Sequence, residues 1–295
     1  MKKQRLDKLL VDRQLCDTRA LAQRIIQAGS VQVNHQVVDK AGTEVPIDAE
    51  ILVKAKPPYV SRGGEKLAKA LAVFPVRVAD RIALDGGIST GGFTDCLFQN
   101  GAKQVYGVDV GYGQVAWNIR TDPRLVLLER TNIRALQPED LYPVGSDRPD
   151  LMVVDVSFIS LVKVLPALWN LLVGVKEAIL LVKPQFEVGR DRIGKKGVVR
   201  DPFDQADSIH QVIQAARALG WTYQDFTWSP LVGPAGNIEY LLWLSTTPEQ
   251  PVPDIEMLQA LAIQARQALI GQTPEETDEM SGTRDKTLDG IPGDD

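Results

Sequence analysis

The spacing of apolar residues predicts two helices near the N-terminus. Leu6, Leu9 and Leu10 fall on one face of the first helix, as expected for a face that packs against a core. A second helical pattern follows, and either Asp17 or Thr18 can cap its start with a side-chain oxygen. The first part of the chain is therefore predicted to be a compact helical unit.

A short hairpin and one more strand follow these helices. Residues 30–38 alternate between apolar and polar side chains around Asn34 and His35, which are placed at a turn. Residues 51–53 are all apolar and predict another short strand. Together with the helices, the strands predict a small α+β domain over residues 1–55.

The pattern changes after a segment rich in proline and glycine. This segment, KAKPPYVSRGGEK, predicts a linker over residues 56–64. Apolar runs then alternate with helical patterns, which indicates an α/β domain, residues 65–246, with a mostly parallel sheet covered on both faces. The runs are RIALDGG, QVYGVDV, LVLLER, LMVVDVSFI, AILLVKP and YLLWLS. A helical extension is expected over residues 247–271, with its helix between Asp254 and Ile270.

Charge is distributed unevenly, which changes the meaning of the net charge of −5. Residues 272–295 contain eight acidic and two basic side chains, so this tail carries −6 and the rest of the chain +1. The tail is too polar to bury much surface, and we expect it to be disordered. Residues 1–30 contain seven basic and three acidic side chains. This basic end favours a polyanionic partner, although a solvated helix face has the same composition.

Composition excludes several classes of protein. The apolar content of 44% and charged content of 24% are those of a globular protein. No apolar run reaches the roughly 20 residues needed to cross a bilayer, and the start lacks the apolar core of a signal peptide. Cys16 and Cys96 fit neither a disulfide framework nor a metal site. We therefore expect a cytoplasmic protein without membrane contact or bound metal.

The stretch LDGGISTGGF connects a predicted strand to a predicted helix. Its glycines, Gly86, Gly87, Gly91 and Gly92, permit a tight turn and close approach of the backbone to a ligand. The spacing matches neither the dinucleotide-binding motif nor the P-loop. The glycines alone therefore do not identify the ligand.

Two carboxylates beside these glycines restrict the choice. Asp85 precedes them and would repel a pyrophosphate but attract an ammonium group, whereas Asp109 ends the next strand and can bind ribose hydroxyls. These features point to S-adenosylmethionine, and the stretch is similar to the cofactor loop of class I methyltransferases. That resemblance implies methionine contacts from Ser89, Thr90 and Gly91 and adenine contacts from Glu129 and Asn132.

Four further charged residues are candidates for catalysis: Lys66, Asp155, Lys183 and Glu239. Each lies at a predicted strand end or at the opening helix of the domain, so they can converge. Separate surface ion pairs are the alternative. The set resembles the Lys-Asp-Lys-Glu set of FtsJ-like ribose 2'-O-methyltransferases. The chain lacks the Pro-Pro-aromatic motif of amino-group methyltransferases and the cysteine nucleophile of cytosine C5 enzymes.

The chemistry of ribose methylation gives each residue a role. A ribose hydroxyl is a poor nucleophile and must lose its proton as it attacks. Lys183 is expected to take or steady that proton, because a second lysine and partial burial disfavour its charged form. Asp155 and Glu239 would position the lysines, and Lys66 would hold the hydroxyl or its developing charge.

Longer motifs extend the resemblance to a family. PYVSRGGEKL, VYGVDVGYGQ, VKPQFEVGR and GPAGNIEYLL are similar to the TlyA, or haemolysin A, family, and residues 5–54 resemble the S4 RNA-binding module. The resemblance implies an S4 domain joined to a class I, Rossmann-like domain with a mostly parallel seven-stranded sheet. It also implies methylation of cytidine 2'-hydroxyls in ribosomal RNA of the small subunit, the large subunit or both. The S4 residues implied in RNA binding are Arg5, Lys8, Arg19, Gln23 and Arg24.

One basic segment and several aromatic residues complete the expectations. The segment RDRIGKKGVVR, residues 190–200, is expected either to become ordered on RNA or to be a mobile basic loop. Phe93, Phe158 and Phe186 are expected in the core or in a pocket wall rather than as platforms for base stacking. His35 is expected to be solvated or to face RNA rather than to bind a metal.

Three other functions were compared with methyl transfer. A noncatalytic ribosome-assembly factor could retain the fold, but the four candidate catalytic residues argue against it. A pore-forming haemolysin would need a membrane-active segment, which the sequence does not show. A pseudouridine synthase with an S4 module would lack the glycine-rich cofactor loop.

Overall fold

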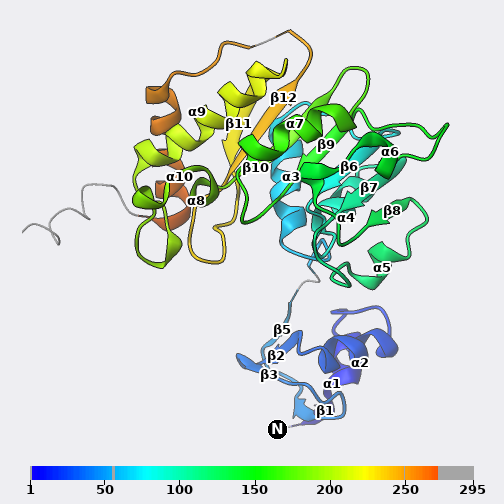
Figure 1. The fold of residues 1–295 in the computed structure, drawn as a ribbon. Coiled ribbons are helices and arrows are strands. Elements are labelled where there is room, and N and C mark those ends of the chain that lie inside the picture. Colours follow the sequence, from blue (N-terminus) through cyan, green and yellow to red (C-terminus); the bar gives the residue numbers. More distant parts are fainter. Residues whose placement is uncertain (1, 55–56, 249, 272–295) are drawn as a thin grey trace, which may run out of the picture. The chain divides into compact units, whose positions relative to one another are not determined.

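The computed structural model describes residues 2–54, 57–248 and 250–271 and divides into two compact units (Figure 1). The first ends at Pro58 and the second begins at Tyr59. The predicted acidic tail lies outside the described residues.

The N-terminal unit packs two helices against short strands. Its elements are β1 (Lys3–Arg5), α1 (Leu6–Asp12), α2 (Arg19–Gln27), β2 (Val31–Val33), β3 (Gln36–Val37), β4 (Glu44–Pro46) and β5 (Ile51–Val53). Leu6, Leu9 and Leu10 are buried in its core, as predicted. Asn34 and His35 both have positive φ, which is the geometry of a two-residue hairpin turn between β2 and β3. The β1–β4 pair was not predicted.

Thr18, and not Asp17, caps the second helix. The hydroxyl oxygen of Thr18 accepts a hydrogen bond of 3.2 Å from the amide of Leu21. This bond satisfies one of the backbone donors left free at the start of a helix.

The larger unit contains a seven-stranded sheet in the order β11-β12-β10-β9-β6-β7-β8. The strands are β6 (Ile82–Gly86), β7 (Gln104–Val108), β8 (Leu125–Leu128), β9 (Leu151–Val154), β10 (Glu177–Val182), β11 (Thr222–Trp228) and β12 (Tyr240–Ser245). Only β12 runs antiparallel to its neighbours β10 and β11. Six strands coincide with the predicted apolar runs. The seventh, β11, was not located from the sequence because its residues mix polar and aromatic side chains.

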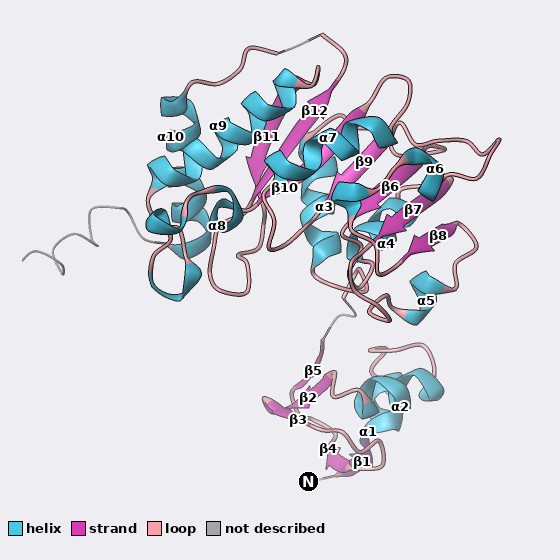
Figure 2. Cartoon of the chain, in the orientation of Figure 1, coloured by secondary structure: helices cyan, strands magenta, loops and turns pink. Residues whose placement is uncertain are grey.

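Helices cover both faces of this sheet (Figure 2). They are α3 (Gly63–Val73), α4 (Gly92–Gln99), α5 (Trp117–Arg120), α6 (Pro138–Leu141), α7 (Leu161–Leu171), α8 (Pro184–Glu187), α9 (Pro202–Ala218) and α10 (Ile255–Ile270), with short 3-10 turns η1 (Ile133–Ala135), η2 (Arg190–Arg192) and η3 (Lys195–Gly197). Alternate residues of β9 point to opposite faces, so Val153 packs with α3 and α4 whereas Met152 packs with α7 and α9. The sheet therefore separates two apolar cores.

Two helix boundaries bear on the predictions. Helix α3 begins at Gly63, so the last two residues of the predicted linker are helical. Helix α10 begins after Asp254, whose side chain accepts a hydrogen bond from the amide of Met257. Among the helices of the described ranges, none has the length and apolar character needed to span a membrane.

Candidate active site

Four charged side chains from distant parts of the chain meet at the edge where the parallel strands end. Lys66 lies on the first turn of α3, Asp155 and Lys183 directly follow β9 and β10, and Glu239 directly precedes β12. The Nζ atom of Lys66 lies 2.6 Å from Oε2 of Glu239 and 3.9 Å from Oδ2 of Asp155. The Nζ atom of Lys183 lies 2.6 Å from the other oxygen of Asp155, Oδ1. The side chains thus form one connected series of ion pairs rather than separate surface pairs.

The sheet register explains this convergence. The last pair between the antiparallel strands β10 and β12 is Val182 with Tyr240. The next residue on each side is Lys183 and Glu239, so these two residues lie side by side. The amide of Asp155 donates to the carbonyl of Gly86 at 2.9 Å. The cluster therefore lies directly beside the glycine turn.

The four charged side chains of the cluster are largely shielded from water. The side chains of Glu239, Lys183, Lys66 and Asp155 are 2%, 8%, 13% and 21% exposed. A buried carboxylate without a partner is strongly unfavourable, so Glu239 depends on Lys66. A Cβ atom at Gly233 would lie 2.8 Å from Oε1 of Glu239, and a glycine there leaves room for the carboxylate.

Ser157 is a further neighbour of Lys183 that sequence reasoning missed. The Nζ atom of Lys183 donates to Oγ of Ser157 at 2.8 Å, in addition to its contact with Asp155. Both partners are hydrogen-bond acceptors, so together they fix the direction in which the amine points. The available signal was a polar residue two positions after Asp155 in DVSF.

The glycine turn after β6 brings the backbone close to Asp155. Gly87 has a φ of +90°, and a Cβ atom there would lie 2.5 Å from the carbonyl oxygen of Asp155. Ser89 and Gly91 also have positive φ. Only glycine fits at position 87, since any side chain would collide with backbone atoms that cannot move aside.

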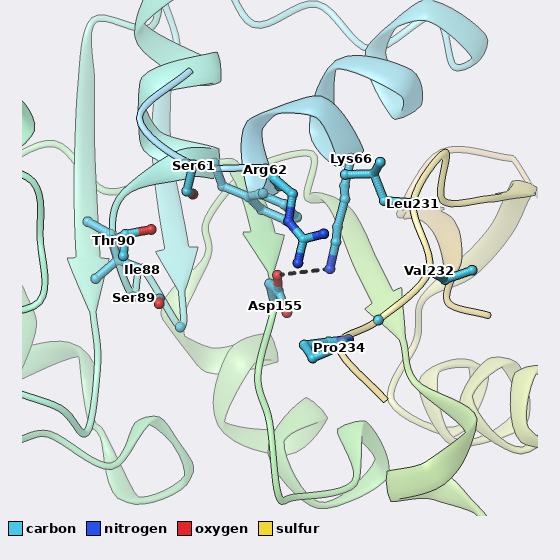
Figure 3. Close-up of a pocket in the computed structure, with 15 residues that line it drawn as sticks. Ser61, Arg62, Lys66, Ile88, Ser89, Thr90, Asp155, Leu231, Val232 and Pro234 are labelled. Carbon is cyan, nitrogen blue, oxygen red and sulfur yellow. Dashed lines mark ion pairs between the residues drawn. The ribbon is translucent and has the colours of Figure 1, made fainter. Parts of the chain in front are cut away.

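A cavity of about 230 Å³ opens between this turn, the start of α3 and residues 231–234. Figure 3 shows Arg62, Lys66 and Asp155 extending into the same space, with Ser89 and Thr90 on its other side. Arg62 was not among the predicted site residues. We name this space the acceptor cavity.

A second cavity, of about 310 Å³, lies between the ends of β7 and β9 and the segment after β8. Apolar side chains such as Val108 and Ile133 line it together with the polar Asp109 and Asn132. We name it the nucleoside cavity. The two cavities share a wall made of Gly87, Ser89 and Asp155, so Asp155 is the member of the ion-pair cluster that lies where they meet. Lys66 lines the acceptor cavity, whereas Lys183 and Glu239 lie behind these linings.

The predicted cofactor residues divide into two groups. Those that line a cavity are Gly87, Ser89, Thr90, Asp109 and Asn132. Those outside the cavity linings are Asp85, Gly86, Gly91 and Glu129. Glu129 instead accepts hydrogen bonds from the amide of Gly113 and the guanidinium of Arg120.

The carboxyl group of Asp85 is fully buried. Its Oδ2 accepts a hydrogen bond of 2.6 Å from the Thr94 hydroxyl, and its Oδ1 has no hydrogen-bond partner in the described residues. Burial raises the pKa of Asp85 to about 7, against the opposing effect of the Thr94 hydroxyl. Contact between Asp85 and a cofactor ammonium stays a prediction.

The three phenylalanines differ in exposure. Phe93 is buried and lines the acceptor cavity, whereas Phe158 lines the nucleoside cavity and is 92% exposed. The rings of Phe158 and Phe186 are 5.3 Å apart between centroids. Phe158 is therefore part of a pocket wall but not of the core.

The basic segment 190–200 has contacts with other parts of the larger unit. Arg192 pairs with Asp204 at 2.6 Å and with Asp207 at 2.5 Å, both on α9. Val199 is buried, and its amide donates to Oδ1 of Asn237 at 2.9 Å. These contacts attach Arg192 to α9 and Val199 to the loop before β12, while ordering of the segment on RNA stays a prediction.

Comparison with known families agrees with this geometry. Residues 59–246 match the model of FtsJ-like methyltransferases, and residues 4–51 match that of the S4 domain. The 16S/23S rRNA (cytidine-2'-O)-methyltransferase TlyA of Mycobacterium tuberculosis is 46% identical over 244 residues, which cover 82% of this chain and 90% of that protein. The chain belongs to the TlyA family of FtsJ-like methyltransferases.

Other relatives of this TlyA-family chain cover most of its length. YqxC of Bacillus subtilis is 49% identical over 265 residues, 88% of this chain and 93% of that protein. A solved structure from Streptococcus thermophilus, which bears a hemolysin name, has a TM-score of 0.69 and 40% identity, and covers 95% of this chain and 99% of that one. The family and the fold inferred from the sequence motifs are thereby confirmed.

In the S4 domain, three of the predicted RNA-binding residues converge on one buried carboxylate. Arg5 and Arg19 pair with Asp7 at 2.9 and 3.0 Å, and Gln23 donates to it at 3.0 Å. The two arginine side chains remain about half exposed. Asp7 therefore holds their guanidinium groups on one face, while Lys8 and Arg24 are exposed without a contact to Asp7.

Acidification and the variant Asp7→Asn are both expected to destabilise the S4 domain. The Arg5 guanidinium, with Gln23 and Arg19, holds the pKa of Asp7 well below its usual range. A lowered pKa means that this stabilisation is present above the unfolded-state value of 3.8 and is lost as the pH falls below it. At pH 7 the variant should lose about 2 kcal/mol, the scale of hydrogen bonds to a charged group.

Hydrogen exchange of residues 6–12 in the full chain measures this effect. Asp17→Asn is the control, because Asp17 is exposed and does not cap α2. Equal protection of α1 in both variants at pH 7 would contradict the role assigned to Asp7.

Proposed function

We propose that the protein transfers a methyl group from S-adenosylmethionine to the 2'-hydroxyl of a cytidine in ribosomal RNA. The observation that carries the proposal is the connected cluster of Lys66, Asp155, Lys183 and Glu239 at the junction of two cavities. The relative TlyA, whose name gives rRNA cytidine 2'-O-methylation, supports the choice of substrate. Ribosomes lie in the cytoplasm, so we place the protein there.

The residues of the nucleoside cavity fit the adenosine part of S-adenosylmethionine. Apolar side chains form walls for a purine ring, and Asp109 lies at the end of β7. The two carboxylate oxygens of Asp109 accept hydrogen bonds from the amides of Ser89 and Gly111 at 2.8 and 2.7 Å. Each oxygen keeps a second lone pair, so the carboxylate can also accept from ribose hydroxyls.

The acceptor cavity fits the methionine part and the incoming ribose. Ser89 and Thr90 lie on one side of it and Lys66 on the other. S-adenosylmethionine, when bound, supplies a methyl group on a positively charged sulfur. The shared wall of Gly87, Ser89 and Asp155 would hold such a sulfur next to the cluster.

The protein contributes proton transfer and positioning. Lys183 receives the hydroxyl proton at Nζ, while Oδ1 of Asp155 and Oγ of Ser157 hold the two hydrogens of its amine. Lys66 donates from Nζ to the attacking oxygen as negative charge develops on it. Glu239 keeps Lys66 in that position through their 2.6 Å contact.

The S4 domain supplies affinity for the RNA backbone. Four cationic side chains can bind RNA phosphates: Arg5 and Arg19, which pair with Asp7, and the exposed Lys8 and Arg24. Contacts of this kind do not distinguish one base from another. Binding should therefore weaken as the salt concentration rises.

Methyl transfer by the purified full chain tests the proposal. The chain is incubated with S-adenosylmethionine labelled in the methyl group and with each ribosomal subunit or its free RNA, all lacking the modification. The expected product is labelled 2'-O-methylcytidine. Absence of transfer to every one of these RNAs, with RNA binding retained, would instead support a noncatalytic ribosome-assembly factor.

A further inference from the structure

A third cavity, of about 230 Å³, is lined by the basic segment, the start of α9, the loop before β12 and the end of α10. Its charged lining residues are two arginines, Arg200 and Arg266, and no carboxylate lines it. Asn237 lies between the lining residues Gly236 and Ile238, and its side chain bridges the carbonyl of Gly197 and the amide of Val199 at 2.9 Å each. We name it the arginine cavity.

Arg266 is buried without a counter-charge. It is 8% exposed, and no acidic group of the described residues forms an ion pair with it. One terminal nitrogen donates to the carbonyl of Arg200 at 3.2 Å, but Nε has no hydrogen-bond partner in the described ranges. A guanidinium without a counter-charge that lines a cavity can bind an anion that enters it.

We propose that the arginine cavity binds a phosphate of the RNA backbone near the nucleotide that is methylated. The inference rests on the proposed function, because it assigns a subsite to that substrate. A planar guanidinium can donate two parallel hydrogen bonds to phosphate oxygens. Arg266 provides the buried cation and Arg200 a second one at the mouth of the cavity.

The position of the cavity favours RNA as the source of the phosphate. Gly233 and Pro234 line the acceptor cavity, and the next two residues, Ala235 and Gly236, line the arginine cavity. Two residues of chain span at most about 7 Å, so the two cavities lie on either side of one short segment. A strand whose ribose enters the acceptor cavity can therefore place a neighbouring phosphate in the other.

The surrounding charge has the same sign. The exposed side chains of Arg190, Lys195 and Lys196 extend the positive surface beyond Arg200, and Asp191 is the one acid in residues 190–200. The other source of an anion is the acidic end of this chain, because Ile270 lines the cavity and the acidic stretch starts soon after it.

The salt dependence of RNA binding tests the proposal. The affinity of the full chain for short oligocytidylate is measured without S-adenosylmethionine over a range of NaCl concentrations, by fluorescence anisotropy. Arg266→Gln is expected to reduce the slope of log affinity against log salt by about 0.7, the value for one single-stranded phosphate contact. Arg77→Gln, which removes an exposed charge 77% accessible to solvent, should leave the slope unchanged.

Two further readouts separate binding from folding and from catalysis. Arg266→Gln should unfold at the same temperature as the parent or higher, because it removes an unpaired buried charge. With ribosomal RNA as substrate, it should raise KM about tenfold and leave kcat within about twofold, as expected for a group that only binds. An unchanged salt slope in Arg266→Gln would overturn the proposal, even in a protein that methylates RNA.

A full chain with Glu275 and Glu276 changed to Gln tests whether the acidic end of the chain, rather than an RNA phosphate, occupies the cavity. If these acids fill the cavity, Arg266→Gln leaves the salt slope of the otherwise unchanged chain as it is. It then lowers the slope only in the chain that also has Glu275 and Glu276 changed to Gln, and this result overturns the proposal. The expected result is the same loss of slope in both backgrounds. Because the readout is binding, absence of methyl transfer would refute the proposed function without affecting this result.

Discussion

Lys183→Ala is expected to lower kcat for methyl transfer by about 10²–10⁴-fold, the range for loss of a general base. Its amine is held by Asp155, which lies in the wall shared by the two cavities, and by Ser157, which lines the nucleoside cavity. The side chain of Lys183 itself lines neither of the two cavities. RNA and S-adenosylmethionine should therefore bind with affinities within about threefold of the parent.

The matched control for this variant is Lys103→Ala. Lys103 precedes β7 at the opposite edge of the sheet, and its exposed side chain pairs with Asp147. Single-turnover methylation should be normal in the control. Full methylation by Lys183→Ala would refute the catalytic assignment, and loss of RNA or cofactor binding would show that Lys183 acts in binding.

Asp155→Asn is expected to have the second largest effect, a loss of about 10²-fold in kcat. The carboxylate of Asp155 contacts both lysines, at 2.6 Å for Lys183 and 3.9 Å for Lys66. An amide of the same shape keeps the packing but removes the negative charge between two amines. It also presents an N–H group where Lys183 now donates.

Initial rates at saturating S-adenosylmethionine, together with calorimetric titration of the cofactor, separate the two possible effects of this change. Asp147→Asn, an exposed carboxylate with a surface partner, is the control. A parent-like kcat in Asp155→Asn would mean that the lysines do not need this charge. The cluster would then be structural.

The sequence identified the ends of the strands that form the site. LMVV and AILLV are short buried runs, so the polar residues that follow them, Asp155 and Lys183, could be assigned to one edge of a parallel sheet. Lys66 and Glu239 were added by resemblance to a family motif. Their contact of 2.6 Å depends on the antiparallel pairing of β12 with β10, which the apolar pattern does not specify.

Features that depend on long-range packing were not predictable in the same way. Asp7 was counted as one charge among others in a basic segment, yet folding buries it under Arg5 and Arg19. The sequence also did not reveal that the carboxylate of Asp85 is fully buried and accepts a hydrogen bond from Thr94. In both cases the sequence identifies a carboxylate, but the groups that surround this carboxylate depend on tertiary contacts.

The contacts of the basic segment were also not predictable from the local sequence. Its composition predicted a basic loop that becomes ordered on RNA or stays mobile, and it did not indicate that Arg192 pairs with Asp204 and Asp207, on the first turns of α9. These two partners lie a dozen or more positions further along the chain, so the composition of residues 190–200 alone did not reveal them.

The most direct test compares ribosomal RNA from cells with this gene, without it, and with the Lys183→Ala version. Each RNA is mapped nucleotide by nucleotide for 2'-O-methylation. We predict at least one cytidine in ribosomal RNA that is methylated only in cells with the parent gene. Identical methylation maps in all three kinds of cell would contradict the account.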